Sequence, residues 1–396
     1  MAKTVRLTRE SKRLAVTVLA LVVALGSTIR VQAADPGTRE SGDVGIQVQA
    51  PLASPMPSLI SLVRIPSSLE FCKEAVPLDI PDVRERLERE ILLALQEQAQ
   101  VILWLKRSTR YFPEIEAMLR DNGLPDDLKY VAVVESALRP HAGSQKNAIG
   151  FWQFTEGTGK RHGLIINARR DERRNLRTAT WAAISYFRTL YGIFGSWTLS
   201  VAAYNMGEDG LMAAILEQGV DSYYQLYLPL ETQAFVFKIL AAKLILSDPA
   251  RYGFQLATED YYPPLSTDRV QVQCSRETPI RIVAQAAKTY FKVIKDLNPE
   301  IRGSWLPEGT HTLLIPSGAA SEFQKRYSAV VEEWLAARDK QIYVVKEGDT
   351  LTSIAARFKV PVSALLEWNR LKAKATIRPG DKVIVRKAAK EEAEVD

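Results

Sequence analysis

The sequence predicts a mainly α-helical protein that ends in small α+β units. Between residues 82 and 250, apolar side chains recur every three or four positions and no strand-like alternation appears. After Pro249 the composition changes, and two segments that resemble each other follow. A chain of 396 residues is long enough for two or three domains. We therefore expect a helical domain over residues 81–250, followed by two βααβ modules.

The positive charge of the chain is concentrated near its N-terminus. The formal net charge is +6, and six basic residues and one acid within positions 1–33 account for +5 of it. The rest of the chain is nearly neutral. A nearly neutral body gives no reason to expect a nucleic-acid partner.

Residues 1–33 have the pattern of a secretory signal peptide. A basic region precedes an apolar run over residues 14–25, and Val31-Gln32-Ala33 supplies small residues for cleavage. A run of twelve residues is short for a bilayer span, so we expect cleavage and no stable transmembrane anchor. A retained anchor is the alternative.

Turn and helix-capping signals predict the elements between residues 34 and 119. Residues 34–80 are rich in Pro, Ser and Gly and are predicted to be a linker, with some order near Phe71. A long helix is expected over residues 82–105, with Asp82 as its N-cap and Glu85 completing a capping box. A second helix is expected over residues 113–119.

The helical domain continues with a helix that Pro125 opens, and then with a loop through three glycines near residue 160. The remaining helices are expected over residues 178–192, 197–204, 211–217 and 231–246.

The C-terminal third contains a weak internal repeat. Thr278 and Thr350 begin similar segments, and Asn298 and Asn369 hold equivalent places 71 residues apart. We expect modules over residues 268–317 and 341–387, whose last strands cover 311–315 and 382–385. A helix over residues 322–338 should form a connector spanning 318–340, and the charged residues 388–396 should form a loose tail.

One carboxylate, Glu135, lies within the apolar part of residues 128–154. Val131, Val134 and Leu138 recur around it at helical spacing, so its side chain should lie on or beside the buried face. Loss of hydration there raises a carboxyl pKa, which is the state that a general acid needs near neutral pH. The alternative is a structural carboxyl that backbone donors satisfy.

The remaining reactive side chains indicate no cofactor and no metal. His141, His162 and His311 show no metal-ligand spacing with cysteines or acids. Cys72 and Cys274 could pair in an oxidising compartment or remain separate thiols, and the sequence leaves both alternatives open.

Residues 82–250 resemble the lytic transglycosylase family whose fold is related to goose-type lysozyme. The motifs stand in the family's order, and Leu124-Pro125 and Leu230-Glu231-Thr232 also fit. They are Glu135-Ser136, Ala148-Ile149-Gly150-Phe151-Trp152-Gln153-Phe154 and Ala203-Tyr204-Asn205-Met206-Gly207. The resemblance implies a lysozyme-like helical catalytic domain that acts on peptidoglycan, and the whole arrangement resembles the membrane-bound D-type members of the family.

The resemblance also implies the residue roles. Glu135 would be the catalytic acid and base that cleaves the bond after N-acetylmuramic acid (MurNAc) without water, giving a 1,6-anhydro product. Substrate contacts would come from Ser136, Ser144, Gln153, Tyr204 and Asn205. From the residues themselves, Ser136 could instead bond the helix backbone, Tyr204 could be core packing and Asn205 could cap the next helix.

The last module resembles a LysM module, and the earlier one resembles a degenerate copy. Glu277-Thr278-Pro279 stands in the earlier module where Gly-Asp-Thr would be expected. LysM modules imply binding of N-acetylglucosamine (GlcNAc) chains. The expected contacts are Gly348, Asp349, Thr350, Leu351 and Ile377.

The chain departs from the family pattern at Asn147, where Gly is usual, at Phe151 and Met206, and at Phe235, where Tyr is frequent. Two alternatives remain: a lysozyme-type hydrolase that uses the same Glu135, and a non-catalytic peptidoglycan-binding protein. The expected location is the periplasm, in association with the cell wall or membrane, and no protein partner is implied.

Overall fold

The computed structural model describes residues 63–338, 341–372 and 375–386. The predicted signal peptide, the tail and most of the predicted linker lie outside the described residues. The chain divides into two units, Met1–Arg64 and Ile65–Asp396, and the elements below belong to the second unit.

The folded part of the chain begins before the expected boundary at residue 81. Strands β1 (Glu70–Phe71) and β2 (Glu74–Ala75) form an antiparallel hairpin, and the Phe71 side chain is fully buried. The Glu74 carboxylate accepts hydrogen bonds from the backbone N–H groups of Trp197 at 2.5 Å and Thr198 at 3.1 Å. A carboxylate at this position stabilises the first turn of the helix that starts at Trp197.

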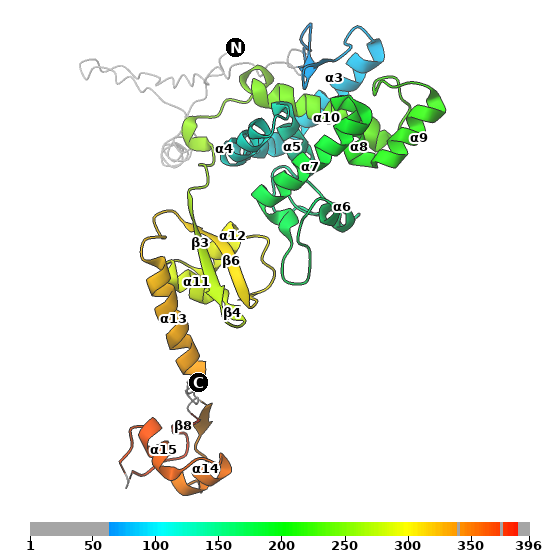
Figure 1. Ribbon diagram of the computed structural model, residues 1–396. Coiled ribbons are helices and arrows are strands. Elements are labelled where there is room, and N and C mark those ends of the chain that lie inside the picture. Colours follow the sequence, from blue (N-terminus) through cyan, green and yellow to red (C-terminus); the bar gives the residue numbers. More distant parts are fainter. Residues whose placement is uncertain (1–62, 339–340, 373–374, 387–396) are drawn as a thin grey trace, which may run out of the picture. The chain divides into compact units, whose positions relative to one another are not determined.

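The helical part confirms the predicted fold class (Figure 1). Its 3-10 turns are η1 (Asp126–Leu128), η2 (Glu172–Arg174), η3 (Ala250–Tyr252) and η4 (Thr258–Asp260). Its α-helices are α3 (Pro81–Gln96), α4 (Gln98–Asp121), α5 (Lys129–Ser136), α6 (Glu156–Arg161), α7 (Leu176–Phe194), α8 (Trp197–Met206), α9 (Glu208–Gln218) and α10 (Leu230–Ser247).

The predicted boundaries of the first two helices are wrong. The helix expected over residues 82–105 breaks at Glu97, and the segment 113–119 is part of α4, which continues through Pro113. Proline removes one backbone hydrogen bond, but the buried face formed by Ile115 and Leu119 holds α4 in place. The expected cap is also wrong, because Asp82 lies inside the first turn and pairs with Arg86.

A helix, α6, replaces part of the loop that was expected after residue 154. The Thr155 side chain caps it by accepting a hydrogen bond from the Thr158 backbone N–H at 3.3 Å. Its sequence contains Gly157 and Gly159, which weaken the helix signal, so the capping residue was the better indicator of its start.

The core of the helical part is centred on α8 and α10. Val201, Ala202 and Ala203 of α8 are fully buried, as expected for a helix surrounded by others. Helix α10 packs against α3, α5 and α8. The helix that carries Glu135 and the helix that carries Tyr204 therefore rest on the same neighbour.

The second C-terminal module has the predicted βααβ order, and the first differs from the prediction by a second, short pair of strands around its two helices. In the first, β3 (Thr267–Cys274) pairs antiparallel with β6 (Gly309–Pro316), and β4 (Thr278–Pro279) pairs with β5 (Trp305–Leu306). Its helices are α11 (Ile280–Ala286), α12 (Phe291–Leu297) and α13 (Phe323–Arg338). The second module consists of β7 (Gln341–Val344), α14 (Leu351–Arg357), α15 (Val362–Trp368) and β8 (Lys382–Arg386), with β7 antiparallel to β8.

Equivalent hydrogen bonds confirm the internal repeat. The Asn298 side chain donates to the Leu314 carbonyl and accepts from the Leu314 N–H, both at 2.8 Å. The Asn369 side chain makes the same pair of bonds to Ile384, at 2.8 and 2.7 Å. In both modules the residue after the second helix therefore fixes the last strand.

The predicted connector helix is not a free spacer. The side chains of Phe323 and Tyr327 in α13 belong to the buried core of the first module.

The two cysteines do not form a disulfide bond. Cys72 and Cys274 are both free and buried, so of the two alternatives that the sequence leaves open, separate thiols are correct. Among the described residues, no helix combines the length and the apolar character needed to cross a bilayer.

Candidate active site

Glu135 is positioned by a short helix that ends immediately after it. Val131 and Val133 of α5 are fully buried, whereas Glu135 is half-buried. The helix ends at Ser136, because Ala137 and Leu138 adopt left-handed conformations with φ of 51° and 57°. Leu138 is therefore buried but does not continue the helical stripe around Glu135.

The turn after Glu135 is held from outside the helix. The Arg107 guanidinium donates a hydrogen bond to the Ala137 carbonyl at 3.0 Å, and the Ala137 N–H donates to the Val133 carbonyl at 2.7 Å. These bonds satisfy backbone groups that a left-handed turn would otherwise leave open.

The Glu135 carboxyl makes no hydrogen bond or ion pair with the residues described here. Burial raises its pKa from 4.5 to about 8, and the nearby charge of Glu231 adds to the rise. Lys146 and Lys238 act in the opposite direction with smaller effect. The alternative of a carboxyl satisfied by backbone donors is therefore wrong. The group is a proton donor near neutral pH that has no internal partner.

The segment that follows α5 forms a compact loop that returns to the helix. The Ser136 hydroxyl donates to the Phe151 carbonyl at 2.8 Å and to the Ala132 carbonyl at 3.0 Å. The Gln153 amide nitrogen donates to the carbonyls of Gly150 at 2.8 Å and Ala142 at 3.2 Å. Ser136 therefore joins α5 to the loop, and Gln153 cross-links the loop itself.

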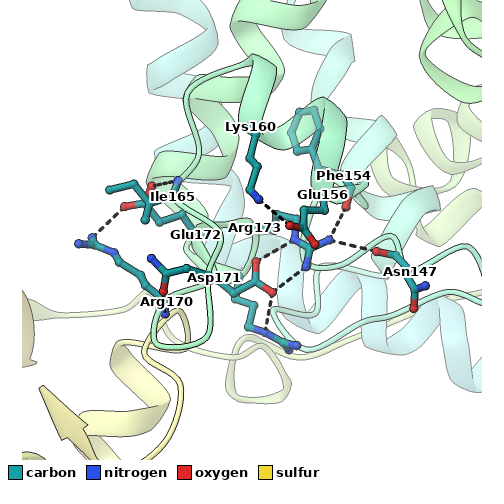
Figure 2. A network of polar contacts seen from close by, with 12 residues as sticks. Asn147, Phe154, Glu156, Lys160, Ile165, Arg170, Asp171, Glu172 and Arg173 are labelled. Carbon is teal, nitrogen blue, oxygen red and sulfur yellow. Dashed lines mark hydrogen bonds and ion pairs between the residues drawn. The ribbon is translucent and has the colours of Figure 1, made fainter. Parts of the chain in front are cut away.

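A buried ion pair fixes the same loop from the other side (Figure 2). Arg173 pairs with Asp171 at 2.8 and 2.9 Å, and the Arg173 guanidinium also donates to the carbonyls of Asn147 at 3.0 Å and Phe154 at 3.2 Å. Burial alone would raise the pKa of Asp171, but the hydrogen bonds and charges of Arg173 and Arg174 lower it. The carboxylate therefore stays ionised, and the pair clamps both ends of residues 147–154.

The close approach of Arg173 explains a motif glycine. Gly150 has φ of +86°, and a Cβ added there would lie 1.8 Å from the Arg173 carbonyl oxygen. No other residue type satisfies both conditions without displacing the backbone. The glycine is thus required by the contact between the loop and the segment that carries the clamp.

Tyr204 lies within electrostatic range of Glu135. Burial raises the pKa of the Tyr204 phenol well above its usual value, and the charge of Glu135 raises it further. Its hydroxyl donates to the Trp152 carbonyl at 2.7 Å, and its ring stacks on Phe187 with centroids 4.8 Å apart. The phenol therefore remains protonated and is a fixed dipole beside the site.

The other carboxylates near these motifs are engaged in structural contacts. Asp127 is partly buried, and Asp171 and Glu172 are buried. Asp126 pairs with Lys129 at 2.5 Å, Asp127 with Lys243 at 2.7 Å, and Glu172 with Arg170 at 2.9 Å. None of these groups is free to be a second catalytic carboxylate. Glu231, whose charge acts on Glu135, is exposed and pairs with Lys146 at 3.1 Å, which leaves Glu135 as the unpaired carboxyl of this group.

Two family models and several known proteins match parts of this chain. Residues 112–226 match the family model of the transglycosylase SLT domain, and residues 343–386 match that of the LysM domain. The chain is 30% identical over 329 residues to membrane-bound lytic murein transglycosylase D of Escherichia coli K12, with 80% of this chain and 72% of that protein covered. The chain belongs to this family of lytic murein transglycosylases.

Further similarities are local. Forty-five residues are 56% identical to the N-acetylmuramoyl-L-alanine amidase XlyA of Bacillus subtilis, covering 11% of this chain and 15% of the amidase. The solved 70 kDa soluble lytic transglycosylase of E. coli shares 18% identity over 46% of this chain and 33% of its own, and the TM-score of 0.32 is too low to support an argument.

The structure shows the surroundings of three residues that depart from the transglycosylase pattern. Asn147 stands where the family usually has Gly, and its φ of +58° is a left-handed conformation that Asn tolerates better than most residues. Phe235 is buried in α10 and brings no hydroxyl to the site. Phe151 packs edge-on against Tyr111, with ring centroids 5.1 Å apart.

The predicted substrate-binding residues of this transglycosylase fall into two groups. Ser136, Gln153 and Tyr204 surround the loop beside Glu135 and bind its backbone carbonyls. Ser144 is exposed at the far turn of the loop, where its hydroxyl accepts from the Ala148 N–H at 3.2 Å. Direct contacts of these side chains with a sugar stay a prediction.

Asn205 does not cap the following helix, so that alternative is wrong. Its side-chain oxygen accepts a hydrogen bond from the Thr232 hydroxyl at 2.8 Å, which joins the end of α8 to the start of α10. The residue before α9 is Gly207, which has no side chain to act as a cap.

The predicted LysM contacts lie at one turn of the second module and in one packed segment. Gly348 has φ of +83°, and the Asp349 carboxylate accepts hydrogen bonds from the Tyr343 hydroxyl at 2.8 Å and the Lys346 N–H at 2.7 Å. Thr350 caps α14, which begins at Leu351. Ile377 packs against the core of the module. Glycan binding by these residues stays a prediction.

Three residues near Glu135 were not predicted from the sequence. Lys146 of the loop and Glu231 of α10 form an exposed ion pair at 3.1 Å, and with Lys238 they set the electrostatic field at Glu135. Glu231 belongs to the motif at the start of α10, and that motif is the signal in the sequence that could have indicated its place near Glu135. Lys146 and Lys238 carry no motif, and only the fold brings them near the acid.

Replacing Gly150 by alanine should destabilise the helical part by about 2–4 kcal/mol, because the new Cβ meets the Arg173 carbonyl and the backbone is left-handed. Urea unfolding followed by tryptophan fluorescence measures this change. Gly157→Ala is the matched control, since a Cβ there meets nothing within 4 Å and helix α6 gains a better helix former. Equal midpoints for the two variants would contradict the contact.

Replacing Glu135 by glutamine should increase stability in a pH-dependent way. The folded-state pKa of about 8 exceeds the ordinary 4.5, so wild-type stability falls relative to the variant as the pH rises from 4.5 to 8. We expect no difference at pH 4 and a gain on the order of 1–3 kcal/mol at pH 8. Calorimetry across this range measures the difference, with the exposed Glu217→Gln as control. A pH-independent difference would contradict the raised pKa.

Proposed function

We propose that this protein is a peptidoglycan lytic transglycosylase that cleaves the β-1,4 bond between MurNAc and GlcNAc. The observation that carries the proposal is the Glu135 carboxyl, which burial keeps protonated near neutral pH and which has no partner among the described residues. Family membership supports the same reaction.

In the first step, the protonated Glu135 donates its proton to the glycosidic oxygen. The bond between C1 of MurNAc and that oxygen breaks, and the GlcNAc residue leaves with a free 4-hydroxyl. The positive charge at C1 is stabilised by the substrate's own N-acetyl group and by hydrogen bonds. Ordinary glycoside hydrolases use two carboxylates, whereas this site offers a single carboxyl.

In the second step, the Glu135 carboxylate takes the proton of the C6 hydroxyl of the same MurNAc. The oxygen attacks C1, which closes the 1,6-anhydro ring and restores the protonated acid without consuming water. Because the nucleophile is already held on the substrate, the step gains the advantage of an intramolecular reaction. A pKa near 8 suits a group that must both donate and accept a proton.

The supporting residues have proposed roles that follow from their contacts. The nitrogen of Gln153 is used by the loop, so its free carbonyl oxygen would accept a hydrogen bond from sugar hydroxyl or amide groups. The Tyr204 hydroxyl, which donates its proton to the Trp152 carbonyl, would hold the loop in place beside Glu135. Ser136, Ser144 and Asn205 would shape the groove that receives the glycan.

We propose that the modules hold the enzyme on its polymer. The catalytic domain would cover residues 81–250, a degenerate LysM-like module 268–317 and a LysM module 341–387, with 318–340 between them. Binding of GlcNAc chains at Gly348–Leu351 and Ile377 would raise the local concentration of scissile bonds. The protein would be exported to the periplasm, where this polymer lies.

Glu135→Gln should abolish product release from purified peptidoglycan, because the amide can neither donate nor accept the proton. Mass spectrometry of the released muropeptides measures this loss and distinguishes the three candidate functions of the protein. A transglycosylase gives 1,6-anhydro ends, a lysozyme-type hydrolase gives reducing ends heavier by one water, and a binding protein gives no fragments. Release of anhydro-muropeptides by the variant would contradict the assignment of Glu135.

Deleting residues 340–396 should weaken co-sedimentation with insoluble peptidoglycan and leave cleavage of short soluble glycans unchanged. The module has its own core, built around Ile354, Leu365 and Val385, so its removal leaves the core residues of the helical domain in place. Pelleting assays measure the bound fraction. Equal pelleting of full-length and shortened chains would exclude the binding role of this module.

A further inference from the structure

A cavity lies between the first and last long helices of the helical domain, outside the residues used in the mechanism. Helices α3 and α10 lie side by side (Figure 1), and between them is a space of about 370 Å³. That volume is within the range of pockets that bind small ligands. The cavity is therefore large enough for part of a substrate.

The lining of this cavity is charged with both signs. Arg86 and Arg89 of α3 and Lys238 of α10 contribute positive charge, whereas Glu90 and Glu231 contribute negative charge. Glu90 is buried and pairs with Arg89 at 2.5 Å, so this pair is part of the cavity wall. A mixed-charge lining suits amino acids, which carry both carboxylate and ammonium groups, better than it suits neutral sugars.

The guanidinium of Arg86 is held in a fixed position. It lies over the Phe237 ring with 4.9 Å between the guanidinium carbon and the ring centroid, and it donates to the Tyr224 carbonyl at 3.3 Å. Its Nε atom is buried without a hydrogen-bond partner. A buried donor without an acceptor is costly and marks a place where an incoming acceptor gains.

Of the three cations that line the cavity among the described residues, Lys238 is the one that is free to bind a ligand. It is exposed and makes no hydrogen bond or ion pair with the described part of the chain. Helix α10, which carries Glu231 and Lys238, packs against α5, which carries Glu135. The charges of both side chains reach Glu135, so this wall of the cavity lies on the helix next to the catalytic acid. A ligand bound to Lys238 would extend from the reacting sugar.

The chemistry of peptidoglycan supplies such a ligand. The MurNAc residue that reacts at C1 carries a peptide on the lactyl ether at C3, two ring atoms away. That peptide contains free carboxylates and, in its diamino acid, an amine. When C1 lies at Glu135, the peptide must leave the sugar close to the acid.

We propose that the cavity between α3 and α10 binds the peptide stem of the MurNAc residue being cleaved, with Lys238 as the partner of a stem carboxylate. The inference rests on the proposed transglycosylase function and adds a determinant of substrate choice. The acids of the lining, Glu90 and Glu231, would favour stems that carry an amine as well as carboxylates.

The test compares Lys238→Met with the wild type on two substrates: glycan strands that carry peptides, and strands from which an amidase has removed them. Assays at pH 6 keep Glu135 protonated with or without the nearby lysine charge. We expect kcat/KM on peptide-bearing strands to fall about tenfold, mainly through KM, because a charged hydrogen bond is lost. Activity on bare strands reports the effect of the lost charge on Glu135 itself, so the proposal predicts a loss on peptide-bearing strands several-fold larger than the loss on bare strands.

Arg84→Met is the matched control, because Arg84 is an exposed cation of α3 outside the cavity, and it should leave both activities unchanged. An equal loss on both substrates for Lys238→Met, or no loss on either, would overturn the proposal. The wild type on bare strands tests the proposed function separately, because anhydro products from that substrate do not depend on a peptide site.

Discussion

The structure depends on the removal of one carboxyl from water. Glu135 sits at the end of a buried helix where burial raises its pKa to about 8; no described donor contacts the carboxyl, and the charges of Lys146 and Lys238 offset the loss of hydration only in part. Such a group destabilises the fold whenever it is ionised, so the surrounding helices must hold it there. Helix α10 does so by packing against α5 while supplying Glu231 and Lys238, which tune the same acid from opposite directions.

The loop after Glu135 carries the strain that this arrangement requires. Ala137, Leu138, Asn147 and Gln153 all have positive φ although none is glycine. Conformations of this kind cost free energy and persist where neighbouring contacts impose them. The contacts come from Ser136 within α5, from Gln153 within the loop, and from the buried Arg173 clamp behind it. Several motif residues therefore shape the loop that faces the catalytic acid.

Much of the fold followed from the sequence, because helical periodicity and the repeated Asn are local signals. The fold class, Glu135 as a desolvated acid and the equivalence of Asn298 with Asn369 were all predicted. The continuation of α4 through Pro113 and the helix α6 were missed, because Pro113 and two glycines gave misleading local signals. The roles of Arg173, Lys146 and Lys238 could not be predicted, since they arise from contacts between segments far apart in sequence.

The most direct test of the account is the titration of Glu135 itself. Carbon-13 NMR of protein labelled at the glutamate side-chain carboxyl resolves this group, and the spectrum of Glu135→Gln assigns its signal by absence. The account predicts a midpoint near pH 8 for that signal. A midpoint near the ordinary glutamate value of 4.5 would show a solvated, ionised carboxylate at neutral pH and would contradict the central claim.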